Sequence, residues 1–162
     1  MNKQNRYMEL TGGMLTEVIV KRPQTPLTIY LAHPGTSEVK TEAKLLQKQL
    51  EDRGYKVLNP FDMDEHSRYL TRFWDTHPEV RKDKKLAEEI VSKDLKAIDK
   101  SDVLVAYVPS PGIGTSMEIF YAKHIRKIPV YILTDIVSPW LMNHGKVVSS
   151  VLKLLEVLKR DL

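Results

Sequence analysis

Four short apolar runs, separated by stretches with helical periodicity, constrain the fold of this chain more than any other feature. The runs are residues 27–32, 55–58, 103–108 and 129–133. Each is short enough to be a strand. The stretches in which apolar residues recur at helical spacing are 38–53, 86–98, 116–126 and 147–158. Strands that alternate with helices predict an α/β fold, a three-layer sandwich with a parallel sheet and helices on both faces.

The first 26 residues do not follow this alternation. Gly12 and Gly13 separate two segments that could each form a strand, so we expect 1–26 to be either a hairpin or a disordered N-terminal arm. The remaining residues, 27–162, are expected to form a single domain, because a chain of 162 residues matches one domain and can bury a core. The irregular stretch 62–85 is expected to be a lid or an insertion.

Composition excludes several classes of function. The chain has no cysteine, which rules out disulfides, thiolate zinc sites and cysteine nucleophiles. His66 and His77 are too far apart for a helical metal pair, so no metal site is expected. The formal net charge of +4 suits an anionic substrate, but no segment combines dense lysine and arginine with aromatics, so no nucleic-acid partner is expected. No stretch resembles a membrane span or a signal peptide, and we therefore expect a cytoplasmic protein with no membrane partner.

The third apolar run is followed by a glycine turn that places a carboxylate at the start of a helix. The segment reads Gly-Ile-Gly-Thr-Ser-Met-Glu from Gly112 to Glu118. In open α/β sheets, ligands bind at the carboxyl ends of the strands, and a carboxylate there can act as a nucleophile. Thr115 and Glu118 also match a capping box, in which Glu118 bonds a backbone N–H in the first turn. The two interpretations are compatible, because the helix dipole favours the ionised carboxylate that a nucleophile needs.

Three further features are expected at the same edge of the sheet. Tyr30 lies near the end of the first run, Asp94 lies on the helix before the third run, and the loop 33–37 follows the first run. Two carboxylates and a tyrosine suit covalent chemistry at a sugar carbon, in which one carboxylate attacks the anomeric centre and the other moves a proton. Taken alone, Asp94 also fits an exposed residue paired with a lysine, and Tyr30 fits a core tyrosine.

The loop after the first run has the features of a phosphate site. Gly35, Thr36 and Ser37 offer backbone N–H groups at the start of a helix, and His33 stands beside them. A plain turn followed by a helix N-cap explains the same residues. Both interpretations therefore stay open for this loop.

Three segments together resemble the nucleoside 2-deoxyribosyltransferases and the related nucleotide N-glycosidases. Residues 29–32 (Ile-Tyr-Leu-Ala) resemble the opening strand of that family. Residues 93–98 (Lys-Asp-Leu-Lys-Ala-Ile), followed by Ser-Asp-Val at 101–103, resemble its second block, and 114–122 (Gly-Thr-Ser-Met-Glu-Ile-Phe-Tyr-Ala) resemble its nucleophile block. The resemblance covers residues 27 to 145, and it rests on the order and spacing of the three segments rather than on any one of them.

The resemblance implies a flavodoxin-like (Rossmann-like) fold and a reaction at the sugar carbon C1′. Glu118 would attack C1′ of a 2-deoxyribosyl group and form a glycosyl–enzyme ester, Asp94 would handle the proton of the base, and Tyr30 would place Glu118. The sugar would pass to another base; the alternatives are a (deoxy)nucleoside 5′-monophosphate hydrolase and a non-catalytic nucleotide-binding or sensor domain. The resemblance also implies nucleoside or nucleotide substrates and no metal or organic cofactor. It further implies a homodimer or higher homo-oligomer whose subunits complete each other's sites.

Several positions depart from the pattern of the family. The position six residues before the nucleophile, often acidic or hydroxyl-bearing, is Gly112, and His33 replaces a usual glycine. Trp140 occupies the place of an asparagine that reaches a neighbouring subunit in some transferases, and Asn143 lies three residues on. These departures bear on the substrate more than on the type of reaction. Besides the loop 33–37, the residues that we expect to bind substrate are Asp62, Gly112, Gly114, Thr115 and Asn143.

Overall fold

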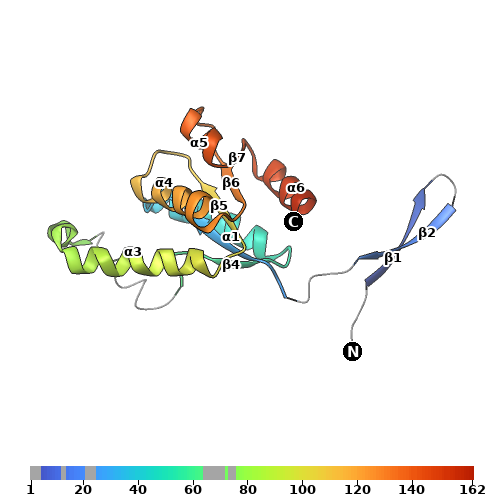
Figure 1. Cartoon of the computed structure of the whole chain (residues 1–162), viewed down its shortest axis with the longest axis horizontal. Coiled ribbons are helices and arrows are strands. Elements are labelled where there is room, and N and C mark those ends of the chain that lie inside the picture. The colour runs from blue at the N-terminus through green and yellow to red at the C-terminus, as the bar shows by residue number, and fades with distance from the viewer. Residues whose placement is uncertain (1–4, 12–13, 21–24, 64–71, 73–75) are drawn as a thin grey trace.

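The computed structural model describes residues 5–11, 14–20, 25–63, 72 and 76–162. Near the N-terminus, β1 (Asn5–Thr11) and β2 (Met14–Val20) pair antiparallel and form a separate two-stranded sheet (Figure 1). The glycine turn expected between these strands lies outside the described residues. So do 64–71 and 73–75, which include His66 and much of the stretch expected to be a lid or an insertion.

The rest of the described chain is built on a five-stranded parallel sheet. Its strands are β3 (Thr28–Ala32), β4 (Lys56–Leu58), β5 (Val103–Tyr107), β6 (Val130–Leu133) and β7 (Lys146–Val148). They lie in the order β4-β3-β5-β6-β7, and every neighbouring pair is parallel. The central strands are almost continuously apolar, as expected for strands that are buried on both faces.

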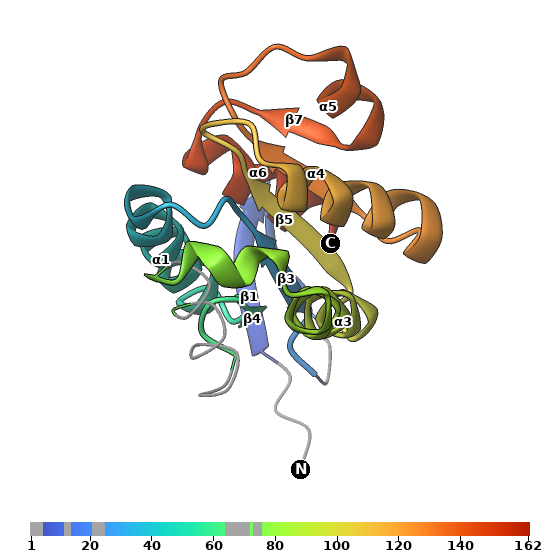
Figure 2. The same cartoon turned by 90° about the vertical axis from the view of Figure 1, so that its left-hand side faces the viewer.

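Helices cover both faces of this sheet (Figures 1 and 2). They are α1 (Ser37–Glu51), the 3₁₀ helix η1 (Pro78–Lys82), α3 (Lys84–Asp99), α4 (Ile113–Phe120), its π-helical continuation η2 (Tyr121–Arg126), α5 (Pro139–His144) and α6 (Val151–Asp161). One apolar core lies between the sheet and α1 with α6, and the other lies between the sheet and α3 with α4. The predicted three-layer, flavodoxin-like α/β sandwich is confirmed.

The C-terminal part differs from the predicted single helix over 147–158. Val147 and Val148 belong to β7, and α6 begins only at Val151, where the hydroxyl oxygen of Ser150 accepts a backbone hydrogen bond of the first turn. A short apolar segment fits a buried strand as well as a helix face, so periodicity alone does not decide between them. Pairing with β6 decides the matter here, because it satisfies the backbone groups along the free edge of that strand.

The helix α4 begins one turn earlier than predicted. Gly112 is its N-cap, and the carbonyl oxygen of Gly112 accepts hydrogen bonds from the backbone N–H (3.0 Å) and the hydroxyl (2.9 Å) of Ser116. Thr115 therefore lies inside the helix, and Glu118 falls in the second turn. The predicted capping box is wrong. Glycine has a low helix propensity, so the sequence around Gly112 and Gly114 predicted a helix start that is too late.

The strand order places a crevice at the carboxyl end of β3. The chain passes from β3 to β4 on one side and later returns to β5 on the other side, so the direction of winding reverses at β3. In doubly wound sheets, ligands bind outside the carboxyl ends of the strands at this reversal. The loops that follow residues 32, 58 and 108 emerge at this edge, as predicted.

Candidate active site

Tyr30 and Glu118 are joined by a short hydrogen bond. Tyr30 is fully buried and points to the α3–α4 side of the sheet, because its neighbours Ile29 and Leu31 face the α1 side. The hydroxyl of Tyr30 donates a hydrogen bond of 2.6 Å to Oε1 of Glu118. Residues from β3 and α4, far apart in the sequence, thus meet in one place.

Asp94 approaches this pair from α3, the helix that packs beside α4 (Figure 2). Its negative charge helps to raise the pKa of Tyr30 and of Glu118, so its carboxylate lies within electrostatic reach of both groups. Burial raises the pKa of Asp94 itself to about 6. The three residues expected to be catalytic are therefore brought together, and Asp94 is not a solvated residue paired with a lysine.

Burial dominates the electrostatics of Glu118. Desolvation is the main cause that raises its pKa to about 8; the charge of Asp94 also raises it, and the hydrogen bond from Tyr30 lowers it. The helix dipole was expected to favour the ionised form, but the carboxylate lies in the second turn, beyond the range of that effect. Two interacting carboxyl groups with values of about 6 and about 8 share one proton near neutral pH.

His33 is buried at the end of β3, where the protein itself surrounds its ring. The Nδ1 atom lies 2.9 Å from the carbonyl oxygen of Pro34, and Nε2 lies 3.2 Å from Oδ1 of Asn59. The ring of Phe61 packs against it, with centroids 4.8 Å apart. Burial lowers the pKa of His33 and thereby favours the neutral imidazole. Both ring nitrogens thus face groups of this chain, which favours the interpretation of His33 as a residue that fills the loop over that of a phosphate ligand.

The loop that follows His33 leads directly into α1. Thr36 is the N-cap of α1 and Ser37 its first residue, but the Thr36 side chain makes no capping hydrogen bond. Gly35 is exposed, and a Cβ atom there would lie 3.2 Å from the Phe61 ring. The helix start expected in this loop is present, which fits both interpretations of the loop, a phosphate cradle and a plain N-terminus.

Gly112 brings the loop after β3 against the start of α4. A Cβ atom at Gly112 would lie 3.2 Å from Cγ of Pro34 and 3.4 Å from Oγ1 of Thr115. Thr115 is buried, whereas Gly114 is exposed and has no heavy atom within 4 Å of the place a Cβ would take. The absence of a side chain at Gly112 therefore has a packing reason, because a larger residue would push the two segments apart.

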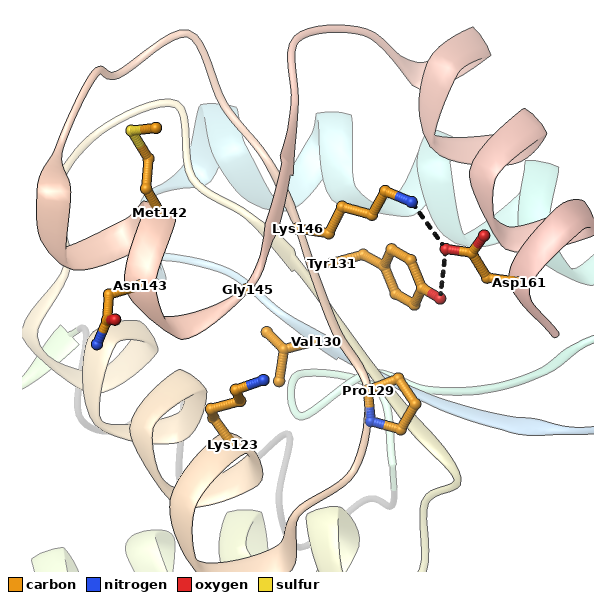
Figure 3. A pocket seen from close by; sticks show the side chains of 9 residues that line it. All are labelled: Lys123, Pro129, Val130, Tyr131, Met142, Asn143, Gly145, Lys146 and Asp161. Atoms are coloured by element: carbon orange, nitrogen blue, oxygen red, sulfur yellow. Dashed lines mark hydrogen bonds and ion pairs between the residues drawn. The ribbon is translucent and has the colours of Figure 1, made fainter.

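Asp62 and Asn143 do not join the hydrogen bond between Tyr30 and Glu118. Asp62 follows β4 and forms an ion pair of 3.4 Å with Lys44 of α1. Asn143 is exposed on α5 and lines a pocket of about 270 Å³ at the amino ends of β6 and β7 (Figure 3). Neither Tyr30 nor Glu118 lines this pocket. Within one chain, Asn143 is therefore not placed to contact a substrate at Glu118.

Asn59 is a buried residue near the site that the sequence did not single out. Its Oδ1 accepts a hydrogen bond of 3.0 Å from the backbone N–H of Phe61 and also faces His33. Its Nδ2 donates a hydrogen bond of 3.0 Å to Oε1 of Gln47. The pair Asn-Pro at 59–60 reads only as the end of a strand, but an amide directly after a strand at the carboxyl edge could have indicated this role.

In the part of the chain that the structure describes, no three histidine, aspartate or glutamate side chains converge as a metal site would require. The described helices also include none that is long and apolar enough to cross a membrane.

Two sequence comparisons identify relatives of this chain. The family model for nucleoside 2-deoxyribosyltransferases matches residues 29–151. The chain is also 31% identical, over 97 residues, to a protein from Thermofilum pendens named 2′-deoxynucleoside 5′-phosphate N-hydrolase 1. That match covers 59% of this chain and 59% of the relative, less than two thirds of its length.

Solved structures share the fold at low sequence identity. The chain is similar to a 2-deoxyribosyltransferase from Bacillus psychrosaccharolyticus, with a TM-score of 0.58 and 18% identity over 78% of this chain and 89% of that one. It is also similar to a pilus assembly-related protein from Burkholderia pseudomallei, with a TM-score of 0.51 and 14% identity over 87% and 92%. These likenesses show the fold alone. The match to the family model extends over most of the chain, and the chain therefore belongs to the nucleoside 2-deoxyribosyltransferase family.

Proposed function

We propose that this protein cleaves the N-glycosidic bond of a 2′-deoxyribosyl nucleoside or nucleotide and passes the sugar to another nucleobase. The observation that carries the proposal is the 2.6 Å hydrogen bond from Tyr30 to Glu118, with the carboxyl group of Asp94 in electrostatic reach. Membership of the family supports deoxyribosyl transfer or N-glycosidic cleavage as the general activity. The roles of the three residues are part of our proposal.

In the first half of the reaction, a carboxylate oxygen of Glu118 attacks C1′ of the sugar. The bond between C1′ and the base nitrogen breaks, its electron pair stays with the base, and the Asp94 carboxyl group gives the base a proton. The product is a glycosyl ester on Glu118. Tyr30 holds the attacking carboxylate in place through its hydrogen bond.

The reactive form carries one proton on the two carboxyl groups. Glu118 must be ionised and Asp94 protonated, whereas the pKa values of about 8 and about 6 place the shared proton mainly on Glu118 at rest. The proton must therefore move to Asp94 before the attack. The hydrogen bond from Tyr30 favours this movement, because it stabilises the ionised form of Glu118.

In the second half, a nitrogen of the acceptor base attacks C1′ and the ester bond to Glu118 breaks. The carboxylate of Asp94 takes the proton of the arriving base, which restores the starting state. A closed site that excludes water would favour this route over hydrolysis.

A second candidate is the hydrolysis of 2′-deoxynucleoside 5′-monophosphates, with water as the acceptor of the sugar. The similarity to the Thermofilum pendens protein favours it, since that relative is named for this reaction. The start of α1, beside His33, would then hold the phosphate. The first half of the reaction is the same in both candidates.

Chromatography of the free bases distinguishes the two candidates. The protein is incubated with deoxynucleosides or with their 5′-monophosphates, with and without an acceptor base. A new nucleoside formed only with the acceptor supports transfer, and base released from monophosphates without acceptor supports hydrolysis. In both cases Glu118→Ala should abolish the reaction, and the mass of the Glu118 peptide should increase by one deoxyribosyl group during turnover of wild type. Binding without any release of base would indicate the sensor domain instead.

We further propose that two or more copies of the chain assemble through α4 and α5. These helices expose large apolar side chains, among them Ile113, Met117 and Phe120 at helical spacing on α4 and Trp140 on α5. Such a surface is unusual for a monomer and typical of an interface. Met117→Lys should produce monomers in sedimentation, whereas Leu152→Lys, at an exposed position of α6, should not. A wild-type monomer would contradict this assembly.

A further inference from the structure

A second cleft lies between α3 and β4, the edge strand of the sheet. Its volume is about 480 Å³, and side chains of both elements and of the loop after β4 line it. Neither Tyr30, Asp94 nor Glu118 is among its lining residues. The three residues proposed to be catalytic thus lie outside the cleft, although Asn59, which contacts His33, belongs to its lining.

The cleft is strongly basic. Four lysines line it, Lys56, Lys93, Lys96 and Lys100, and the one acidic side chain among its lining residues is Asp62. Asp62 is already paired with Lys44, which lies outside the cleft. None of the four lysines forms an ion pair or a side-chain hydrogen bond with another residue of the described chain. Among the described residues, four positive charges without an ionic partner thus surround one cavity, which favours an anionic ligand.

The positions of the lysines favour a ligand with several adjacent negative charges. Lys93, Lys96 and Lys100 follow each other at i, i+3 and i+7, so they share one face of α3 over about 10 Å. Lys56 belongs to β4, on the other wall of the cleft. A single phosphate could contact only part of this row, whereas a chain of two or three phosphates could contact lysines of both walls.

The remaining lining residues favour a ligand that also carries a flat, apolar group. Val57, Leu58, Met63 and Ala97 line the cleft, with the amides of Asn59 and Gln47 nearby as polar partners. A cavity of this size is within the range of small-molecule sites, about 300 to 1,000 Å³. We propose that the cleft between α3 and β4 binds a nucleoside di- or triphosphate, its phosphates on the lysines and its base on the apolar residues.

Titration calorimetry with ADP at about 0.15 M salt tests the proposal, because this salt concentration screens weak surface attraction. The double variant Lys96→Gln/Lys100→Gln should weaken ADP binding about 100-fold, about tenfold for each charged hydrogen bond lost. The control variant Lys153→Gln/Lys159→Gln changes the net charge equally on exposed α6 and should bind like wild type. AMP should bind at least about tenfold more weakly than ADP. Equal losses in both double variants, or equal binding of AMP and ADP, would overturn the proposal.

Two further measurements separate this cleft from the proposed catalytic site. Glu118→Gln saturated with 2′-deoxyadenosine 5′-monophosphate should bind ADP as wild type does; displacement of ADP would place it in the catalytic site and overturn the proposal. The variant Lys96→Gln/Lys100→Gln should release base at the wild-type rate. A single-stranded oligonucleotide is tested in the same way. If it binds more tightly than ADP and the same variant abolishes its binding, the cleft is a nucleic-acid site and the proposal is overturned. ADP binding is measured without turnover, so a failure of the proposed function leaves this test intact.

Discussion

Replacing Glu118 with glutamine should stabilise the protein, and the gain should grow with pH. Burial raises the pKa of Glu118 from an ordinary 4.5 to about 8, so the native state holds this proton more tightly than the unfolded chain does. A group of this kind lowers stability as pH rises from 4.5 to 8, because the unfolded chain releases its proton first. Glutamine has no charge to desolvate and can still accept the hydrogen bond of Tyr30.

The size of the pKa shift sets the size of the effect. Each unit of pKa corresponds to about 1.4 kcal/mol, so Glu118 lowers the free energy of unfolding by up to about 5 kcal/mol above pH 8. The same relation gives about 3 kcal/mol at pH 7 and under about 1 kcal/mol at pH 5. Allowing for relaxation around the ionised group, we expect Glu118→Gln to gain at least about 2 kcal/mol at pH 8. His33 also has a shifted pKa, but both proteins contain it, so its effect largely cancels in the difference. Asp94 interacts with Glu118, and the loss of the repulsion between the two carboxylates in Glu118→Gln acts in the same direction at high pH.

Urea unfolding of wild type and Glu118→Gln at pH 5, 6, 7, 8 and 9 measures this difference. Glu156→Gln, at an exposed position of α6, serves as the control and should give a small difference at every pH. A gain for Glu118→Gln that does not change with pH, or a loss of stability at pH 8, would refute the reasoning. If Glu118→Gln loses catalytic activity and gains stability, the carboxyl group that the reaction needs lowers the stability of the folded protein.

Four other predictions concern the proposed catalytic residues and the packing around Gly145. Asp94→Asn should lower kcat about 100- to 1,000-fold with ordinary nucleobases, but much less with an activated nitrophenyl deoxyriboside; equal losses would argue against Asp94 as the proton donor. The kcat/KM of wild type should follow a bell-shaped pH profile with limbs near about pH 6 and about pH 8. Tyr30→Phe should lower kcat/KM about tenfold to 100-fold and move the limb that reports Glu118 to higher pH. A limb that stays in place would contradict the role of Tyr30. Gly145→Ala should destabilise the protein by about 1–3 kcal/mol, since its Cβ would lie 2.9 Å from side-chain atoms of Ile132; an unchanged Tm in thermal unfolding would show that the neighbours yield.

The sequence predicted the layers of the fold and the proximity of Tyr30, Asp94 and Glu118. Apolar runs identified four of the five parallel strands, because buried strands of a parallel sheet have a strong hydrophobic signal. The fifth, β7, has three residues next to an amphipathic helix, and its pairing with β6 is a tertiary contact that no local pattern contains. Tyr30, Asp94 and Glu118 could be predicted because the resemblance named them and the topology places their elements together.

Other parts of the site could not be predicted, because they depend on packing between distant segments. The helix α4 begins at Ile113 despite the poor helix propensity of Gly114, and the close approach of Gly112 to Pro34 joins segments that no local pattern connects. The raised pKa of Glu118 follows from burial, whereas the position in the sequence indicated only a helix dipole. Asn143 was expected to bind substrate because it lies three residues after the motif position that Trp140 occupies, but it lines another pocket.

The surroundings of His33 leave the native state locally frustrated. The two ring nitrogens face the carbonyl oxygen of Pro34 and Oδ1 of Asn59, and this Oδ1 already accepts the backbone N–H of Phe61. A neutral imidazole has one N–H, so its other nitrogen faces an oxygen with no hydrogen between them, whereas the protonated ring would donate to both oxygens but bury a charge. Neither protonation state is ideal for folding, and conflicts of this kind are expected at functional sites rather than in ordinary cores. Sequence design for stability alone would therefore replace His33. If the designed proteins are more stable but inactive, function rather than folding accounts for the histidine at this position.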